Sequence, residues 1–497
     1  MKKLYELARF CSQHRNVVEA LLQGSENLPI WRLYRLLFSE MNLNNSEAML
    51  ETLGRIDGKQ FSAMKVKMLD ILVKTISIQN VSIDSENIRF NRVLGSLRKN
   101  IAARIILYKG SRSLAIEVLE STLTNSLLDQ VTYDTLDQLR LLKLHYGTSS
   151  YNKYKLNRCL ELESYYTDLL ENETKAINYF IDLKKIELQS LAQISLKEKE
   201  LAARYSKELS EIDARSKNFN YYRFQVQVKK CEFDRNFNEL LELCDKAELE
   251  FSTNEFYSAS SLVVVKQIRL WGLIQLGKYT ESIPLGMSEI ANADFGVTNW
   301  YSFLHYTLKA FLYSAKYVEA SDLITFCIKH PNFKKLNLQM KELANLQLGY
   351  IHLLADSNLD FSATLRRNEL PEFKLGKFLN TTPVFSKDKR GINVSILLMH
   401  IAFLLQRKDY NAIIDRVDSL NQYAYRYLRK DDSFRSNCMI KMVIQMTKAD
   451  FNPIRTARYT ADLRKQLGHV TLAGSGENIE VEIIPFEVLW EIMTKAL

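Results

Sequence analysis

One arrangement of residues recurs along the second half of the chain and constrains the fold more than any other feature. An apolar stretch at helical spacing is followed by two or three polar residues, and an aromatic residue then opens the next helical stretch. Four segments show it: CEFDRNFNELLELC, GLIQLGKYTESIPL, FLYSAKYVEASDLI and FLLQRKDYNAIIDRV, with aromatics at Phe237, Tyr279, Tyr317 and Tyr410. A fifth segment, MTKADFNPIRTA, places Phe451 likewise. The pattern predicts stacked helical hairpins, because each hairpin has two apolar faces and cannot bury both alone.

The spacing of these aromatics supports a repeat. Successive aromatics lie 42, 38, 93 and 41 residues apart, and the gap of 93 is close to two repeats plus an insertion. A period of about 40 residues is typical of stacked helical hairpins. We expect each aromatic to wedge between helices of neighbouring repeats, which predicts that Tyr279 and Tyr317 are largely buried.

The scarcity of helix breakers extends this expectation to the whole chain. Only 16 glycines and 7 prolines occur in 497 residues, against an average usage of about 7% and 5%. A single compact core stops growing at about 250 to 300 residues, so a chain of this length needs several domains or an elongated array. The expected fold class is therefore all-α, with helices joined by short turns.

Changes in the pattern predict three regions. Residues 1–219 form an N-terminal helical array, residues 220–467 carry the repeats, and residues 468–497 form a C-terminal element. Within the repeats, residues 365–391 contain two prolines and two glycines and cannot form one helix. We interpret this segment as an ordered insertion loop, because its three phenylalanines are too apolar for a disordered segment.

The C-terminal element is expected to contain strands. Residues 470–472 and 479–483 flank a Gly-Ser-Gly turn, and the second stretch alternates apolar and acidic side chains. This pattern predicts a small β-hairpin. Pro485 is then suited to begin a last helix over residues 486–496.

Two serines are predicted to begin helices. Ser195 and Ser252 each precede a glutamate by three residues, the capping-box pattern in which both side chains satisfy amides at a helix start. Residues 174–217 contain no glycine or proline, so the box at Ser195 favours two helices there over one long helix. A coiled coil is the alternative to packing within the array, but fewer than three to four heptads are sustained. Its seam would consist of Leu191, Ile194, Leu201, Tyr205 and Ile212.

Two of the turns carry a family resemblance. The sequence G-K-Y-x-E-S from Gly277 to Ser282, and A-K-Y-x-E-A from Ala315 to Ala320, resemble the turn and second-helix start of tetratricopeptide repeats. Over about residues 220–355 the chain resembles the tetratricopeptide-like (TPR-like) α-solenoid superfamily, including bacterial helical-repeat proteins, although the family period of 34 residues is shorter. The resemblance implies a right-handed α-solenoid of antiparallel hairpins whose concave surface binds a protein or peptide.

Motifs for catalysis or metal binding are weak or missing. Gly272 to Lys278 match the first seven positions of a phosphate-binding P-loop, but the intervening residues are in helical register and Tyr279 takes the hydroxyl position. His305 and His400 lie in apolar helical stretches and are expected to be hydrogen-bonded core or groove residues. The six cysteines occur singly among apolar neighbours, which predicts buried thiols in a reducing compartment. We expect no cofactor, no metal site and no enzymatic activity; a catalytic site assembled across helices is the alternative.

Basic and aromatic side chains concentrate in the insertion and in the stretch after Tyr423. Guanidinium groups beside aromatic faces can bind an acidic peptide, or can hold phosphates while bases stack on the rings. A third interpretation is a solvated helix face with tyrosines packed beneath it. The candidate partner-binding residues are Arg366, Arg367, Lys374, Lys377, Arg390, Tyr425, Arg429 and Arg435.

The overall charge and the length of the apolar segments limit the classes of protein to which this chain could belong. The formal net charge of +9 is a mild excess for a chain of this length and does not by itself indicate a dedicated nucleic-acid binder. The start, MKKLYELARFCSQH, lacks the apolar core of a signal peptide, and no apolar run long enough to span a membrane occurs. We expect a cytoplasmic, non-enzymatic scaffold or adaptor that binds a protein or peptide and no membrane. The alternative is a nucleic-acid-binding or regulatory protein that uses the basic, Tyr/Arg-rich C-terminal face.

Overall fold

The chain is helical in all the parts that its computed structural model describes. These are residues 1–24, 28–39, 43–55, 57–78, 88–189, 194–214, 216–253, 259–293, 298–357, 359–360, 362–365, 370–381, 392–427, 434–475 and 481–497. Every regular element within these ranges is a helix, which confirms the all-α class. The chain divides into two compact units, Met1–Ala102 and Ala103–Leu497, here called the N-terminal unit and the C-terminal unit.

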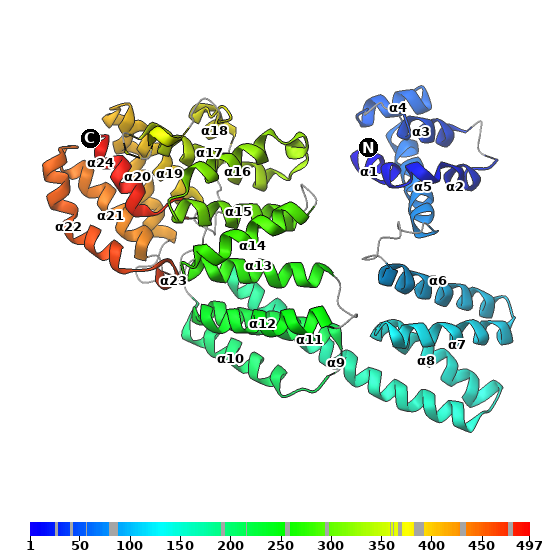
Figure 1. Cartoon of the computed structure of the whole chain (residues 1–497). Coiled ribbons are helices and arrows are strands. Elements are labelled where there is room, and N and C mark those ends of the chain that lie inside the picture. Colours follow the sequence, from blue (N-terminus) through cyan, green and yellow to red (C-terminus); the bar gives the residue numbers. More distant parts are fainter. Residues whose placement is uncertain are drawn as a thin grey trace. The chain divides into compact units, whose positions relative to one another are not determined.

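The N-terminal unit is a small helical assembly (Figure 1). Its core contains Val18, Leu33, Met68 and Leu72, which are almost inaccessible to solvent. Its helices are α1 (Lys2–Phe10), α2 (Arg15–Leu21), α3 (Pro29–Leu37), α4 (Asn45–Leu53), α5 (Gly58–Ile78) and the first part of α6 (Ile88–Tyr108).

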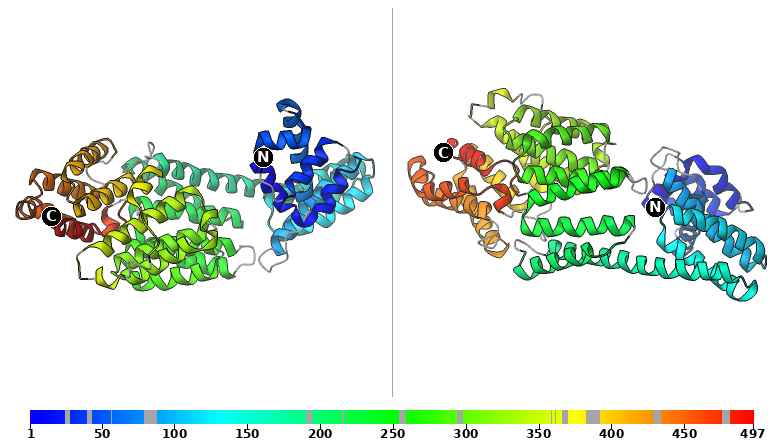
Figure 2. Two further views of the ribbon diagram at one scale, coloured as in Figure 1. Left: turned by 90° about the horizontal axis from the view of Figure 1, so that it is seen from above. Right: turned by 60° about the horizontal axis from the view of Figure 1, so that its bottom comes forward.

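The C-terminal unit is a succession of helices in which neighbours along the chain pack on one another (Figures 1 and 2). The first of them are α7 (Arg112–Leu128), α8 (Thr132–Leu144), α9 (Lys153–Gln189), α10 (Leu196–Ser210), α11 (Lys217–Asp234), α12 (Phe237–Thr253), α13 (Ala259–Gln275) and α14 (Tyr279–Asn292). The others are α15 (Thr298–Tyr313), α16 (Tyr317–Lys329), α17 (Leu338–Asp356), α18 (Leu375–Thr381), α19 (Ile392–Gln406), α20 (Tyr410–Tyr427), α21 (Phe434–Lys448), α22 (Pro453–His469), α23 (Leu472–Ser475) and α24 (Phe486–Lys495). The right-handed solenoid, and domain boundaries after residues 219 and 467, remain predictions.

The predicted repeat turns share one backbone conformation. Helices α12, α14, α16 and α20 each begin at the aromatic residue of the pattern, as predicted. Two residues before each aromatic, the backbone is left-handed, at Arg235 (φ 58°), Gly277 (φ 70°), Ala315 (φ 58°) and Lys408 (φ 57°). The next amide then donates to a carbonyl five residues back, for example Lys278 N to Leu273 O at 2.9 Å. This hydrogen bond closes the preceding helix in the manner of a Schellman motif, so the chain reverses in the same way at each turn.

The aromatics at these turns pack into the core to different degrees. Phe237 and Tyr317 are 5% and 7% exposed, so the predicted burial of Tyr317 is confirmed. Tyr279 is half-buried, and its ring lies 6.3 Å from that of Tyr313. Tyr410 stacks on the ring of Phe451 at 4.5 Å, which joins two successive turns.

The segment that resembles a P-loop is helix and turn. Gly272 lies within α13, and a Cβ atom there would come 2.8 Å from Leu240 Cδ2. Gly286 lies in α14, and a Cβ atom added there would clash with the side chain of Thr307 in α15. Glycine at these two positions therefore allows neighbouring helices to approach closely, and Gly277 provides the left-handed turn between them.

The predicted C-terminal β-hairpin is wrong for the described residues. Residues 472–475 form the helical turn α23, and residues 481–485 run to α24 without strand pairing; residues 476–480 lie outside the described ranges. Side chains of distant helices bind the carbonyls that a partner strand would have used. Ser395 Oγ donates to Val481 O, while Lys309 Nζ and Tyr313 OH donate to Glu482 O at 2.7 and 3.0 Å. The predicted last helix is present as α24.

The two predicted serine caps have different outcomes. Ser195 is the N-cap of α10 and forms the reciprocal capping box with Glu198, so residues 174–217 contain two helices as predicted. Ser252 does not begin a helix, because α12 continues through Thr253 and the Ser252 hydroxyl donates to Leu249 O at 3.1 Å. Three of the four described seam residues, Ile194, Tyr205 and Ile212, pack against the core of the unit, which supports packing within the array over a coiled coil; Leu191 lies outside the described residues.

Two histidines of the apolar helices lie in or near the core. His305 is 5% exposed, and its Nδ1 lies 2.7 Å from Gln347 Nε2, as expected for a hydrogen-bonded core residue. Burial, together with the positive charge of Lys309, lowers the pKa of His305 from 6.5 to about 3. His400 is half-buried, and burial also lowers its pKa.

Acidification from pH 7 to pH 5 is expected to cost about 2 kcal/mol of stability through His305. The unfolded chain binds a proton at His305 below about pH 6.5, whereas the folded chain excludes it until about pH 3. The contribution is thus present above pH 6.5 and is lost as the pH falls. Urea titrations at both pH values measure it, with His305→Gln as the comparison. An equal loss of stability in that variant would contradict the assignment to His305.

Candidate partner-binding groove

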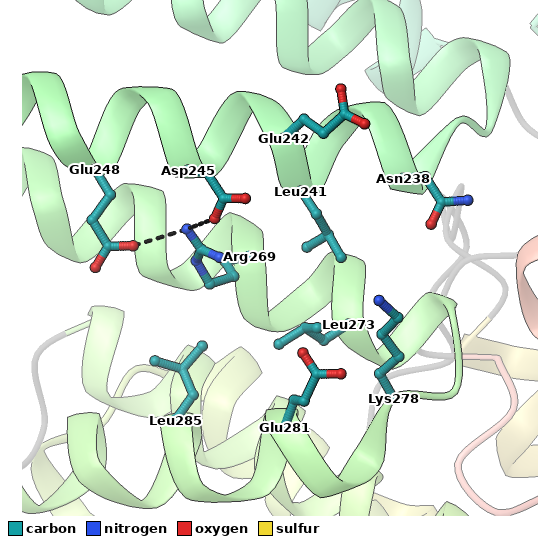
Figure 3. A pocket seen from close by; sticks show the side chains of 10 residues that line it. All are labelled: Asn238, Leu241, Glu242, Asp245, Glu248, Arg269, Leu273, Lys278, Glu281 and Leu285. Atoms are coloured by element: carbon teal, nitrogen blue, oxygen red, sulfur yellow. Dashed lines mark hydrogen bonds and ion pairs between the residues drawn. The ribbon is translucent and has the colours of Figure 1, made fainter.

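An open groove of about 680 Å³ lies between α12, α13 and α14 (Figure 3). Its lining combines acidic, basic and leucine side chains from all three helices. The lining residues are Asn238, Leu241, Glu242, Asp245, Glu248, Arg269, Leu273, Lys278, Glu281 and Leu285. It is therefore a polar trough with an apolar component.

Helical periodicity explains why these side chains meet. The lining residues of α12 recur about once per helical turn from Asn238 through Leu241 and Glu242 to Asp245 and Glu248, so they share one face of the helix. Arg269 and Leu273 are likewise four apart on α13, as are Glu281 and Leu285 on α14. The left-handed turn at Gly277 brings α14 back alongside α13 and places Lys278 at one end of the groove.

Arg269 organises one side of the groove. Its Nη2 atom lies 2.6 Å from Asp245 Oδ1 and 2.9 Å from Glu248 Oε2, both on α12 (Figure 3). Burial disfavours the charged guanidinium, but the hydrogen bond to Asp245 and the negative charges of Asp245 and Glu248 together outweigh burial and raise the pKa of Arg269. These ion pairs link α13 to α12 and occupy two of the four carboxylates.

The other two carboxylates face solvent. Glu242 and Glu281 are exposed on opposite sides of the groove, and Lys278 is the other cation in its lining. In Figure 3, Leu241 and Leu273 lie between the charged groups. The groove thus has two more acidic than basic side chains and an apolar floor, which suits a ligand that carries cationic and apolar side chains together.

Four of the eight residues proposed from sequence fall outside what the structure describes. Lys374 and Lys377 are exposed, and Lys374 Nζ forms a 2.9 Å ion pair with Glu372 Oε1. Tyr425 belongs to α20, but its side chain is not among those described. The remaining predicted surface residues outside the described ranges are Arg366, Arg367, Arg390 and Arg429.

Arg435 is not a surface residue, and its assignment as a partner contact is corrected here. Its side chain is 7% exposed and lies 2.6 Å from Glu482 Oε1 and 2.7 Å from Glu487 Oε2. It also donates to the carbonyls of Leu467 and Val470, at 3.0 and 2.7 Å. Burial disfavours the charge, but the two carboxylates raise the pKa of Arg435. Its donors are engaged within the fold, so Arg435 holds the C-terminal segment in place.

Sequence reasoning did not identify the α12–α14 groove, although a signal was present. The segment FNELLELCDKAELE carries acidic side chains three apart at Glu242, Asp245 and Glu248. This spacing places them on one helix face.

Comparisons with known proteins do not assign a family. No family model matches the chain, and searches of curated proteins and of solved structures find no match. None of the helices in the described ranges has both the length and the apolar character needed to cross a bilayer.

Proposed function

We propose that this chain is a non-enzymatic adaptor, a right-handed TPR-like α-solenoid that binds a protein or peptide segment along the inner surface of its helical array. The proposal rests on a series of helical hairpins in which the chain reverses through the same turn conformation each time. An open groove lies between consecutive helices of this series. Repeat arrays of this kind present extended binding surfaces, because each repeat contributes one strip of side chains.

The side chains that line the α12–α14 groove indicate the chemistry of the peptide segment that it binds. Leu241, Leu273 and Leu285 provide apolar contact, and Glu242 and Glu281 are available to cationic side chains. Arg269 is already paired with Asp245 and Glu248, so it is poorly available to an acidic ligand. A basic segment with interspersed apolar residues therefore fits better than an acidic one.

Charge reversal at the groove tests this function. Peptides of mixed charge and hydropathy, selected from a display library on the full chain, are titrated against the double variant Glu242→Lys/Glu281→Lys. Basic peptides should bind at least about tenfold more weakly, since complementary charge steers association and fixes register. The matched control is Glu161→Lys/Asp418→Lys, two exposed acidic residues on α9 and α20. Equal binding by both double variants, or no selected peptide at all, would contradict the proposal.

A second function, nucleic-acid binding, has one supporting observation in α22. This helix exposes Arg455, Arg458 and Arg464, and the guanidinium of Arg458 lies 5.4 Å from the centre of the Tyr459 ring. An exposed arginine beside an aromatic ring can hold phosphate and stack a base. Binding to RNA or DNA that falls log-linearly with salt would favour this alternative over peptide binding in the groove.

A further inference from the structure

Charged groups of opposite sign occupy different positions along the α12–α14 groove (Figure 3). Lys278 lies at one end, the same end as Asn238. Glu242 and Glu281 lie on opposite sides of the groove, about one helical turn further along α12 and α14. Towards the other end, Arg269 is already neutralised by two carboxylates. A ligand that carries both a positive and a negative group therefore has one preferred direction in this groove.

The groups that give this direction are not engaged within the fold. In the part of the chain that the structure describes, no ion pair or hydrogen bond occupies the side chains of Lys278, Glu242 or Glu281. The side-chain amide of Asn238 likewise has no hydrogen-bond partner among the described residues. All four side chains are exposed. They are therefore available to a ligand without the loss of a contact inside the protein.

Distances along the helices give the spacing that a ligand must match. The lining of α12 from Asn238 to Glu248 spans ten residues, about 15 Å at the rise of an α-helix. An extended chain covers this length in about four to five residues. Glu242 and Glu281 lie four and three residues from the positive end of the groove, which is about 4.5 to 6 Å along it. The positive group of the ligand must therefore lie about two residues from its negative group.

The position of Lys278 at the end of the groove selects the source of the negative group. Side chains of an extended segment stand roughly perpendicular to the chain axis, so an aspartate or glutamate within the segment points to the walls or to solvent. A C-terminal carboxylate continues the chain axis and meets Lys278 and Asn238 directly. The ammonium and the amide both donate hydrogen bonds to a carboxylate, and the bond from the ammonium is strengthened by charge.

We propose that the α12–α14 groove binds the free C-terminus of a partner protein in an extended conformation. The terminal carboxylate binds Lys278 and Asn238. The third residue from the end carries a cationic side chain, which lies between Glu242 and Glu281. The second and fourth residues from the end are apolar and contact the leucines of the groove, since alternate side chains of an extended segment point to opposite sides. This inference rests on the proposed function and adds the direction and the terminal group of the bound segment.

Titration calorimetry of the full-length chain with matched peptides tests the inference. The probe is a short peptide that ends in Leu-Arg-Leu-Ala, prepared as the free acid, as the C-terminal amide, and as an amide whose last residue is glutamate. The free acid should bind at least about tenfold more tightly than either amide, because both amides lose a charge-assisted hydrogen bond at the end of the groove. In the variant Lys278→Met, the affinities of the three peptides should agree within about twofold, because the ammonium that distinguishes them is gone.

The matched control is Lys316→Met, which removes the exposed lysine at the same position of the next hairpin turn and should keep the preference for the free acid. Circular dichroism melting verifies that both variants fold. A free acid that binds no better than the amides, or a preference that persists in Lys278→Met, would overturn the inference.

The same titrations separate this inference from the proposed function. If the three peptides bind equally well and all lose affinity in Glu242→Lys/Glu281→Lys, the groove binds peptides and only the recognition of a C-terminus is wrong. If none of the three binds, the inference is wrong, and the proposed function fails with it when the display library also yields no peptide.

Discussion

Replacing Arg435 by methionine is expected to lower the free energy of unfolding of the C-terminal unit by about 3 to 5 kcal/mol. The substitution removes the partner of Glu482, whose side chain is completely inaccessible to solvent. The buried carboxylate would keep its hydrogen bond from Phe486 N at 2.8 Å but would lose its counter-charge. Two carbonyls that now accept from Arg435, those of Leu467 and Val470, would also lose a donor.

Urea denaturation of the full-length chain, followed through the transition of the C-terminal unit, provides the measurement. Arg464→Met on α22 is the control, because Arg464 is exposed and its loss should change stability by no more than about 0.5 kcal/mol. The double variant Arg435→Met/Glu482→Gln should recover part of the loss, since it removes the uncompensated charge. A loss below about 1 kcal/mol for Arg435→Met would show that the buried pair is not needed by the fold.

Truncating Tyr317 to alanine should cost about 3 to 5 kcal/mol, the usual range for removing a large aromatic side chain from a core. Tyr317 begins α16, is 7% exposed, and belongs to the largest core cluster of the C-terminal unit. Its side chain is buried within this cluster, so its removal would leave a cavity in the core. Thermal or urea unfolding measures the loss.

The control for this change is Tyr133→Ala on α8, where the tyrosine is 76% exposed. That substitution should change stability by about 0.5 kcal/mol or less. Similar losses for the two tyrosines would mean that the aromatic at the turn does not join neighbouring hairpins, and the repeat interpretation would lose its physical basis.

The sequence predicted those features of the fold that depend on residues close together in the chain. The four aromatic helix starts and the capping box at Ser195 depend on residues within one turn of each other. The turns were located even though only Gly277 provides the glycine that a left-handed position favours; arginine, alanine and lysine occupy the others. The change from an apolar helical stretch to two or three polar residues was sufficient to locate these turns. The predicted solenoid, its handedness and the partner depend on how distant hairpins stack, which no local signal specifies.

The errors came from contacts that are far apart in the chain. Residues 481–483 have the alternating pattern of a strand, but their backbone is bound by Lys309, Tyr313 and Ser395. Arg435 stands in a Tyr/Arg-rich stretch that indicates a surface, and its carboxylate partner Glu482 lies 47 residues away. A serine followed by a glutamate at the right spacing predicted a helix start at Ser252, yet that residue lies within α12, beside the buried Phe251.

The docking of residues 481–487 also sets an order of events during synthesis of the chain. Lys309 and Glu482, which share a hydrogen bond, are separated by 173 residues. A ribosome adds residues at about 5 to 20 per second, so Lys309 waits roughly ten seconds or more before its acceptor exists. Arg435 is synthesised later and precedes its carboxylate partner Glu482 by 47 residues. Lys309 and Arg435 therefore reach these contacts only after translation of residues 481–487.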